Sequence, residues 1–369
     1  MPGTPAPRRV TAADVARAVG VSRATVGFVL NNTPGQTISE ATRARVLGAA
    51  ARMGYRPHRA ATALAGGRSR IVLLVLPDWP AEFSMRMYLE EAARALDEAN
   101  YSLVTQTQTA ERTARPLWES LNPDVVIGWS PFSAEDVASM HAAGIARILP
   151  SPDEPVTLDR APGVTEGTRL QIGHLYDLGH RRIAYAAAAD TRIADLVRAR
   201  TSAAAAEAEA RGIRLHDVRS IDPAAPSLAD CPGSAGQFVR AWRADGVTAI
   251  AAYNDDVAAA VAGAALRTGL RVPEDLAVVG HDDSPLASLF VPSLSSVRMD
   301  AVRAGRYLAA LALQEAEARP VAAGVDEMVT CLVARESTGA GLGDTGAVPT
   351  GGGATVRARD AQGSRPKGA

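Results

Sequence analysis

Short apolar runs alternate with amphipathic helical stretches from residue 71 to residue 338, and this alternation is the feature that most constrains the fold. Parallel strands need long crossover connections, which are usually helices, so alternating strands and helices indicate a parallel sheet. The pattern therefore predicts an α/β body in two similar halves. Its strand candidates are residues 71–76, 102–106, 125–129, 146–149, 182–187, 249–253 and 276–280.

The first 55 residues carry a different pattern, that of three short helices. Thr11, Ser22 and Ser39 are good N-caps, and Gly20 and Gly54 are typical ends for the first and third helices. The tight turn between the first two helices predicts a helix-turn-helix module. The residues expected to face its core are Val15, Ala16 and Val19 in the first helix, Val26, Val29 and Leu30 in the second, and Val46, Leu47, Ala50 and Met53 in the third.

The formal charge is unevenly distributed along the chain. Residues 1–70 hold eleven arginines against Asp14 and Glu40, a charge of +9, and the remainder carries −10, so the whole chain is at −1. A basic module joined to an acidic body indicates a polyanion partner for the first part, because neutralising phosphates releases counterions. On charge alone, a solvated basic surface is the alternative.

The N-terminal motifs resemble those of the LacI/GalR family of transcriptional regulators. The resemblance implies a repressor that binds a near-palindromic operator in double-stranded DNA as a homodimer, with a tetramer left open. It also implies a helix-turn-helix domain over residues 9–66 that includes a hinge helix over 57–65. The motifs are Val10-Thr11, Val19-Gly20-Val21-Ser22, Thr25-Val26, Leu30-Asn31-Asn32, Thr42-Arg43 and Gly54-Tyr55-Arg56-Pro57.

In a helix-turn-helix the second helix enters the major groove and its first residues meet base edges. Arg23 is the expected reader, since a guanidinium can bond guanine O6 and N7 together, and a phosphate contact is its alternative. The family usually has Ser-Arg where this chain has Gly27-Phe28, so we expect a different operator. Gly27 would allow a closer approach of the backbone, and Phe28 would meet a thymine methyl group or pack inward.

Two residues of the expected hinge helix match family positions, one of which acts on the minor groove. Leu64 falls on the wedge that unstacks a base step, and Ala61 falls on the small packing position, with an ordinary linker as the alternative. The full set of expected DNA-binding residues is Thr11, Ser22, Arg23, Ala24, Thr25, Gly27, Phe28, Asn31, Tyr55, Arg59, Ala61 and Leu64.

The motifs of the body resemble the effector domain of the same family. The implied fold is a two-lobe α/β domain of the type I periplasmic-binding-protein-like class over residues 70–339, with parallel sheets and crossovers near 160, 298 and 329. A small-molecule effector is expected in the cleft at the strand ends. The motifs are LGHRRIAY from Leu178, Asn254-Asp255, VPEDL from Val272, VGHDD from Val279, Pro292-Ser293-Leu294 and REST from Arg335.

Six residues are expected to contact the effector. Arg200, Asn254 and Asp282 match the family's usual contacts, and their side chains can bind neighbouring sugar hydroxyls, although Asn254 and Asp282 could instead cap a helix and a turn. Aromatic side chains near strand ends would stack on a ligand or pack in the core. They are Trp79, Phe83 and Trp129.

Three departures from the family affect the same site. Ser151-Pro152 replaces an Asp-Arg pair, Gly163-Val164 replaces an Asp-Asn pair, and His281 replaces an aromatic residue and is expected to be hydrogen-bonded. The lost groups bind hydroxyls. The expected effector is a sugar or a related molecule, but because of these losses a modified sugar, a non-sugar or no effector stays open.

Other functions have little support in the sequence. Cys231 and Cys331 have no metal-ligand spacing and are expected as buried apolar thiols, so no metal or cofactor is predicted. Without catalytic motifs the chain is not expected to be an enzyme. No apolar run approaches the ~18 residues of a membrane span, so a cytoplasmic location is expected. The alternative function is a cytoplasmic solute-binding-type protein without an operator, and residues 340–369 are expected to be disordered.

Overall fold

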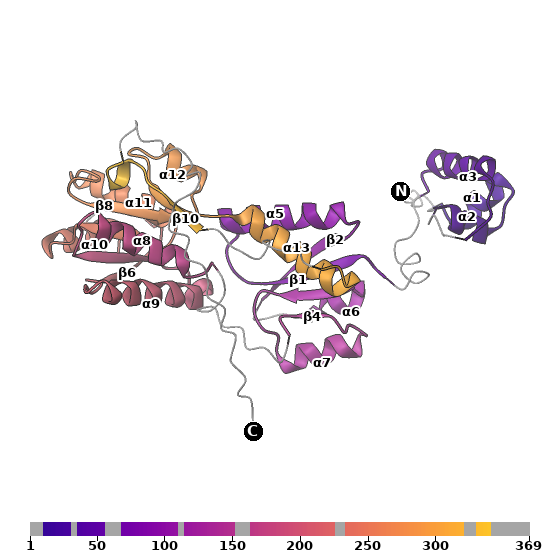
Figure 1. The fold of residues 1–369 in the computed structure, drawn as a ribbon, viewed down its shortest axis with the longest axis horizontal. Helices are drawn as coiled ribbons and strands as arrows, with labels where there is room; N and C mark the ends of the chain where they lie inside the picture. The colour runs from indigo at the N-terminus through magenta and orange to yellow at the C-terminus, as the bar shows by residue number, and fades with distance from the viewer. Residues whose placement is uncertain are drawn as a thin grey trace, which may run out of the picture. The chain divides into compact units, whose positions relative to one another are not determined.

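The computed structural model describes residues 10–30, 35–55, 68–109, 114–151, 163–225, 233–320 and 330–340. The predicted hinge helix over 57–65, with Arg59, Ala61 and Leu64, lies outside these ranges, as do Asn31 and the tail from residue 341. The described ranges form a helical module and two α/β parts, drawn in Figure 1.

The helical module contains α1 (Ala12–Val19), α2 (Arg23–Leu30) and α3 (Glu40–Arg52). The predicted caps are confirmed: Thr11 Oγ1 accepts from Asp14 N at 3.3 Å, the Asp14 carboxylate accepts from Thr11 N at 2.9 Å, and Ser22 Oγ accepts from Thr25 N at 3.0 Å. Gly20 ends α1 with φ +71°, in the left-handed region that favours glycine.

The core of the module differs from the prediction at two residues of α3, Leu47 and Ala49. The buried side chains of α3 are Val46, Ala49 and Ala50, whereas Leu47, which was predicted to face inward, is 47% exposed. Successive residues of a helix are 100° apart, so Leu47 lies far from the face centred on Val46 and Ala50. The inward prediction for Leu47 is therefore wrong.

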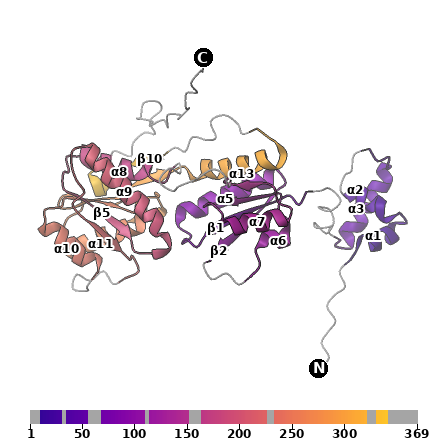
Figure 2. The same cartoon turned by 90° about the horizontal axis from the view of Figure 1, so that it is seen from below.

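The first α/β part has a four-stranded parallel sheet in the order β2-β1-β3-β4. Its core lies on both faces of the sheet because successive strand residues point to opposite sides. Val72 and Leu74 pack against α5 and α13, and Leu73 and Val75 pack against α6 and α7. Figure 1 shows α5 and α13 on one side of the sheet and α7 on the other, and Figure 2 shows the same elements from below. The elements are β1 (Ile71–Pro77), β2 (Ser102–Gln108), β3 (Val125–Gly128), β4 (Ile148–Leu149), α5 (Phe83–Glu98), α6 (Leu117–Leu121), α7 (Ala134–Ala142) and α13 (Ala301–Glu317).

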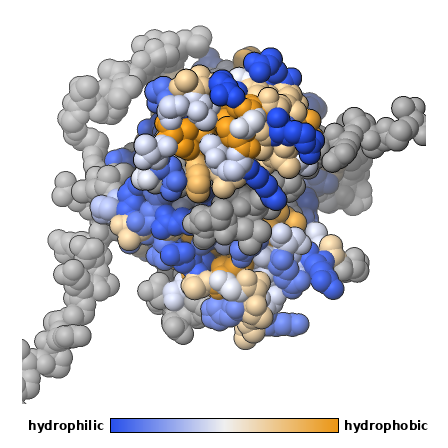
Figure 3. Space-filling view, turned by 90° about the vertical axis from the view of Figure 1, so that its right-hand side faces the viewer, coloured by the Kyte–Doolittle hydropathy of each residue, from blue (hydrophilic) through white to orange (hydrophobic). Residues whose placement is uncertain are grey.

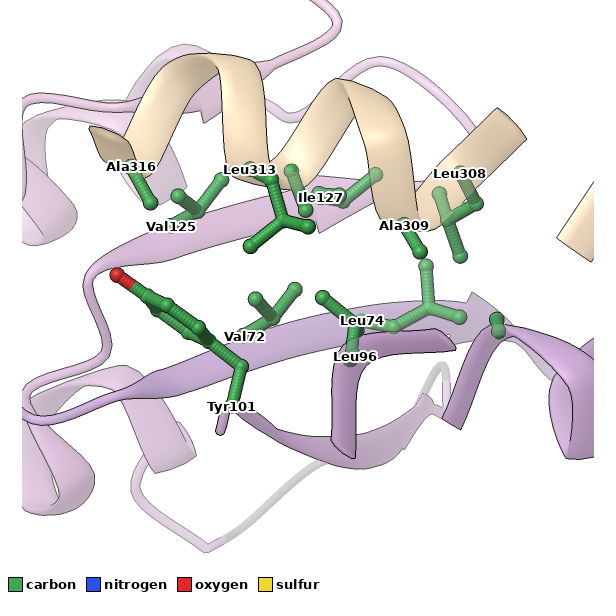
Figure 4. Close-up of a cluster of buried hydrophobic side chains, with 12 residues drawn as sticks. Val72, Leu74, Leu96, Tyr101, Val125, Ile127, Leu308, Ala309, Leu313 and Ala316 are labelled. Carbon is green, nitrogen blue, oxygen red and sulfur yellow. The ribbon is translucent and has the colours of Figure 1, made fainter. Parts of the chain in front are cut away.

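Helix α13 comes from the far end of the sequence and completes the core of this first part. Figure 4 shows its apolar side chains over those of β1, β3 and α5, with Leu308 and Leu313 facing Leu74 and Val72. Gly305 allows this close packing, because a Cβ atom there would lie 2.5 Å from the carbonyl oxygen of Tyr88. A larger residue at position 305 would push α13 away from α5.

The second α/β part has a six-stranded sheet in the order β10-β9-β8-β7-β5-β6, parallel except for the antiparallel pair of β9 and β10. Three of its strands, β6, β9 and β10, were not among the sequence candidates. The elements are β5 (Ile183–Ala188), β6 (Val218–Ile221), β7 (Ala249–Ala252), β8 (Ala277–His281), β9 (Ser295–Met299), β10 (Thr330–Val333), α8 (Glu166–Asp177), α9 (Ala194–Ala210), α10 (Ala235–Ala244), α11 (Asp255–Arg267) and α12 (Pro285–Leu289).

The chain divides into two compact units, residues 1–157 with 300–328 and residues 158–299 with 329–369. These divisions agree with the crossovers expected near 160, 298 and 329. No helix in the described ranges is long and apolar enough to span a membrane. Cys331 corrects a prediction, since it is exposed on the edge strand β10, which pairs on one side with β9 alone. Cys231 lies outside the described residues.

Candidate nucleic-acid interface and effector site

The start of α2 presents the residues predicted to meet base edges. Ser22, Arg23 and Ala24 are exposed, while Gly27 and Phe28 are half-buried. They project from a helix that Val26 and Val29 anchor in the core of the module. The described residues thus place an arginine and a small apolar surface on the outward side of α2.

Four of the predicted DNA-binding residues, Thr11, Ser22, Thr25 and Tyr55, also have structural roles, and Ser22 is the cap of α2 described above. Thr11 caps α1, Thr25 shares a 2.8 Å hydrogen bond between its hydroxyl and that of Ser22, and Tyr55 packs at the edge of the core. Tyr55 N donates to Ala50 O at 2.9 Å, which closes the C-terminal end of α3. These contacts fix the positions of the three helices and leave any DNA contact of the same residues as a proposal.

In the first unit, two predicted aromatic residues meet at the carboxyl ends of neighbouring strands. Trp79 follows β1 and Trp129 follows β3, and their rings lie 6.1 Å apart edge to face. Tyr88, which the sequence analysis missed, lies 4.9 Å from Trp129 and has its pKa raised by burial. Phe83 contacts the guanidinium of Arg86 at 5.5 Å. The edge of the sheet between β1 and β3, where strand order reverses, is thus rich in aromatic rings.

In the second unit, the predicted polar residues lie at the equivalent edge, beside β5, β7 and β8. Arg200 on α9 is buried, donates from Nη1 to Tyr253 O at 2.8 Å, and lies 4.6 Å above the Tyr253 ring. Asn254 follows β7 and caps α11, its Oδ1 accepting from Val257 N at 2.9 Å. The structure therefore confirms the capping role of Asn254. Burying a guanidinium among carbonyl and ring groups fixes its direction.

Asp282 follows β8 in an unusual backbone conformation. Its φ is +96° and that of Asp283 is +46°, two consecutive residues in the left-handed region that side chains disfavour. Hydrogen bonds hold them there, from Asp282 N to Val297 O at 2.8 Å and from Asp283 N to Ser296 Oγ at 3.0 Å. The surrounding strands therefore impose the position of the Asp282 carboxylate.

His281 is fully buried, and its Nδ1 lies 2.9 Å from Oδ1 of Asp282, which confirms the expected hydrogen bond. Burial and the nearby Arg200 lower the pKa of His281, so the neutral ring can donate from Nδ1 to the carboxylate. Its Nε2 has no hydrogen-bond partner among the described residues and faces Gly167, where a Cβ atom would lie 2.3 Å away. The hydrogen bond from the buried His281 therefore orients the carboxylate of Asp282.

Asp255 was missed as a site residue, although it stands beside Asn254. Its buried carboxylate accepts from Ser296 Oγ at 2.6 Å and Ser284 N at 2.7 Å, which ties α11 to β9 and to the turn after β8. Burial, with a smaller contribution from the charge of Asp282, raises the pKa of Asp255 to about 7, although the two hydrogen bonds act to lower it. Only the folded chain brings these four residues together, so sequence spacing gives no sign of them.

Two family models match the chain. A model for bacterial regulatory proteins of the lacI family matches residues 11–58, and one for the periplasmic binding protein-like domain matches residues 172–338. The first covers the helical module, and the second covers the sheet edge that carries Arg200, Asn254 and Asp282.

Proteins named as transcriptional regulators or repressors are similar over most of the chain. The HTH-type transcriptional regulator GalR of Escherichia coli (strain K12) is 31% identical over 337 residues, 89% of this chain and 95% of the relative. The ribose operon repressor of Bacillus subtilis (strain 168) is 29% identical over 355 residues, 89% of this chain and 98% of the relative. A solved structure of the lac repressor dimer bound to operator and the anti-inducer ONPF gives a TM-score of 0.68 at 25% identity, over 90% of this chain and 99% of that one.

Proposed function

This chain belongs to the lacI family of bacterial regulatory proteins and is a DNA-binding transcriptional regulator, and from that premise we propose that it is a repressor acting in the cytoplasm. It binds a near-palindromic operator as a homodimer, and a small molecule changes its affinity for DNA. The family is one of transcriptional regulators, so no catalytic step is assigned to the chain.

The observation that carries the DNA-binding proposal is the exposed start of α2 on a packed three-helix module. Exposed Arg23 at the first position of α2 can reach base edges, and the +9 charge of residues 1–70 favours a polyanion. The residues proposed to contact DNA are Thr11, Ser22, Arg23, Ala24, Thr25, Gly27, Phe28 and Tyr55, together with Asn31, Arg59, Ala61 and Leu64 outside the described ranges.

The small-molecule proposal rests on side chains at the carboxyl ends of the strands in each of the two sheets. One edge presents the ring cluster of Trp79, Trp129 and Tyr88, and the other presents Arg200 and the oriented carboxylate of Asp282. Aromatic faces and fixed hydrogen-bonding groups are what sugars and related polyols require. The lac repressor structure that resembles this chain holds both an operator and an anti-inducer. Ligand and DNA must affect each other's affinity equally.

The homodimer proposal is supported by three consecutive apolar residues at α12. Leu289 is 76% exposed and Val291 is 81% exposed, and Phe290 between them is half-buried. Scattered exposed apolar residues are ordinary, and Figure 3 shows such residues interspersed among hydrophilic ones on another face. A run of three is typical of a surface that a partner covers, and we assign it to a second copy of this chain.

Genomic DNA fragments provide the test. The full-length protein should select a small set of fragments over random duplex, and a variant lacking residues 1–66 should lose this selection while the rest of the chain stays folded. Adding monosaccharides and related polyols one at a time should shift the affinity of the selected fragments. A deletion variant that still selects the same fragments would refute the assignment of DNA binding to the module.

A further inference from the structure

The outward face of α2 is largely apolar. Arg23 and Gly27 lie one turn apart on that face, and Ala24 and Phe28 lie one turn apart beside them. The hydroxyls of Ser22 and Thr25 are bonded to each other at 2.8 Å, and Ser22 also caps the helix. The outward face of α2 between residues 23 and 28 therefore offers the exposed guanidinium of Arg23, a methyl group and a phenyl ring.

Phe28 does not belong to the core of the module. The described core consists of side chains from all three helices and from the segments around them, including Val26, Val29 and Leu30 of α2. Phe28 is half-buried and is not packed against that cluster. Of the two sequence-based expectations for this ring, inward packing is thus the weaker one.

Gly27, the residue before Phe28, determines how closely the phenyl ring can approach a groove of DNA. At Gly27 a Cβ atom would meet no heavy atom within 4 Å, so the backbone there faces open space. Without a side chain at position 27, the helix can lie nearer to base edges. Nothing in the core requires glycine at this position, because its φ is not in the left-handed region.

The chemistry of the major groove then selects what the ring can contact. Most base-edge atoms are donors or acceptors, and covering them with a phenyl ring would remove their water without replacing its hydrogen bonds. The C5-methyl group of a pyrimidine is the exception, since burying it against a ring removes apolar surface from water. A phenyl ring therefore favours a methyl-bearing pyrimidine.

We infer that Phe28, together with Ala24 one turn before it, reads the C5-methyl group of a thymine in each operator half-site. The inference rests on the proposed function, because it needs α2 in the major groove. It makes Phe28 a specificity-determining residue in place of a hydrogen-bonding reader. Arg23 then supplies the hydrogen-bonded base contact and Phe28 the apolar one.

Removing one methyl group at a time from the DNA tests the contact between Phe28 and thymine. The full-length protein first selects its preferred duplex from random sequences, and each thymine is then replaced by deoxyuridine, which removes the methyl group alone. One position per half-site should lose about fourfold in affinity, the value of one buried methyl group. The loss should vanish in Phe28→Ala and persist in Phe28→Leu, which keeps an apolar side chain.

A matched control comes from the same module. Leu47 on α3 is also apolar and is 47% exposed, but it lies off the recognition helix. Leu47→Ala should leave the effect of deoxyuridine unchanged. Circular dichroism of all variants checks that the helices persist. Methylating each cytosine at C5 shows whether 5-methylcytosine is read by the same ring, and coupling there supports the contact when deoxyuridine has also identified a thymine whose effect depends on Phe28.

Two results overturn the inference in different ways. If deoxyuridine weakens binding equally in the wild-type chain and in Phe28→Ala, or if it weakens binding at no position, Phe28 does not read a methyl group even though the operator is real. If the full-length protein prefers no duplex at all, the proposed function fails, and this inference fails with it.

Discussion

Asp255, at the start of α11, links this helix to β9 and to the turn after β8. Its carboxylate holds the backbone of Ser284 and the hydroxyl of Ser296, and a Cβ atom on Gly280 would lie 2.2 Å from its Oδ1. These contacts of Asp255 therefore fix the turn that carries Asp282. A carboxyl group so deeply buried favours its neutral form, which is why its pKa rises.

This pKa predicts a dependence of stability on pH. Between pH 3.8 and about 7, the folded chain keeps a proton on Asp255 that the unfolded chain has lost, so raising the pH favours unfolding. From about pH 5 to about pH 7.5, the free energy of unfolding should fall by on the order of 2 kcal/mol more in the wild-type chain than in Asp255→Asn. Urea unfolding at several pH values measures this difference.

An exposed aspartate gives the control for that experiment. Asp195 on α9 is 73% exposed, so Asp195→Asn should follow the pH dependence of the wild-type chain. Identical pH curves for wild-type and Asp255→Asn would show that Asp255 is ionised in the folded chain at neutral pH.

At the scale of elements, α2 contains a residue of weak helix propensity, a glycine, in its interior. Gly27 lies mid-helix, and an alanine there meets no steric obstacle. Glycine costs up to about 1 kcal/mol relative to alanine within a helix. The module therefore gives up stability at this position of α2.

Gly27→Ala is expected to stabilise the module by about 0.5–1 kcal/mol and to weaken operator binding by holding α2 away from the bases. Hydrogen exchange of the α1–α3 amides in the full-length chain measures the first effect, and DNA titration measures the second. Gly48→Ala in α3 is the matched control, since only the end of the Arg52 side chain lies within 3.4 Å of its Cβ position. Equal loss of binding in both variants would contradict a close approach at Gly27.

The strands missed from sequence show where local patterns fail. β9 begins with Ser295 and Ser296, both fully buried, whose hydroxyls bond Thr338 at 2.6 Å and Asp255 at 2.6 Å. A serine pair reads as a loop in sequence, and only distant partners make it suitable for a buried strand. β10 pairs with β9 alone and exposes Cys331, so its pattern is also weak.

For the whole molecule, the exposed run at α12 predicts the state of assembly. The double variant Leu289→Asp, Val291→Asp should weaken self-association of the full-length chain at least about tenfold, since covering a large apolar side chain is worth about 1.5–3 kcal/mol. Sedimentation over a range of concentrations measures it. Leu178→Asp, at a 48% exposed position after α8, should sediment as the wild-type chain does. If the double variant and this control behave alike, α12 is not the dimer surface.

The sequence by itself determined the local elements and the family. Caps such as Thr11 and Ser22, the turn at Gly20 and the apolar strand at 71–76 depend on neighbours within a few residues, so they are readable along the chain. The alternation of strands and helices likewise determined a parallel α/β body.

Tertiary structure alone decided which residues surround each candidate site. Tyr88 on α5 meets Trp129 after β3 because α5 and β3 contribute to the same core. Helix α13 completes the first unit from more than 200 residues away, as the hydrogen bond from Arg306 Nε to Glu91 at 2.6 Å shows. Asp255 after β7 meets Ser296 on β9, with β8 between these two strands. These contacts depend on strand order and on burial, which are properties of the packed sheet. A buried polar group is stabilised only by partners that the completed fold brings to it.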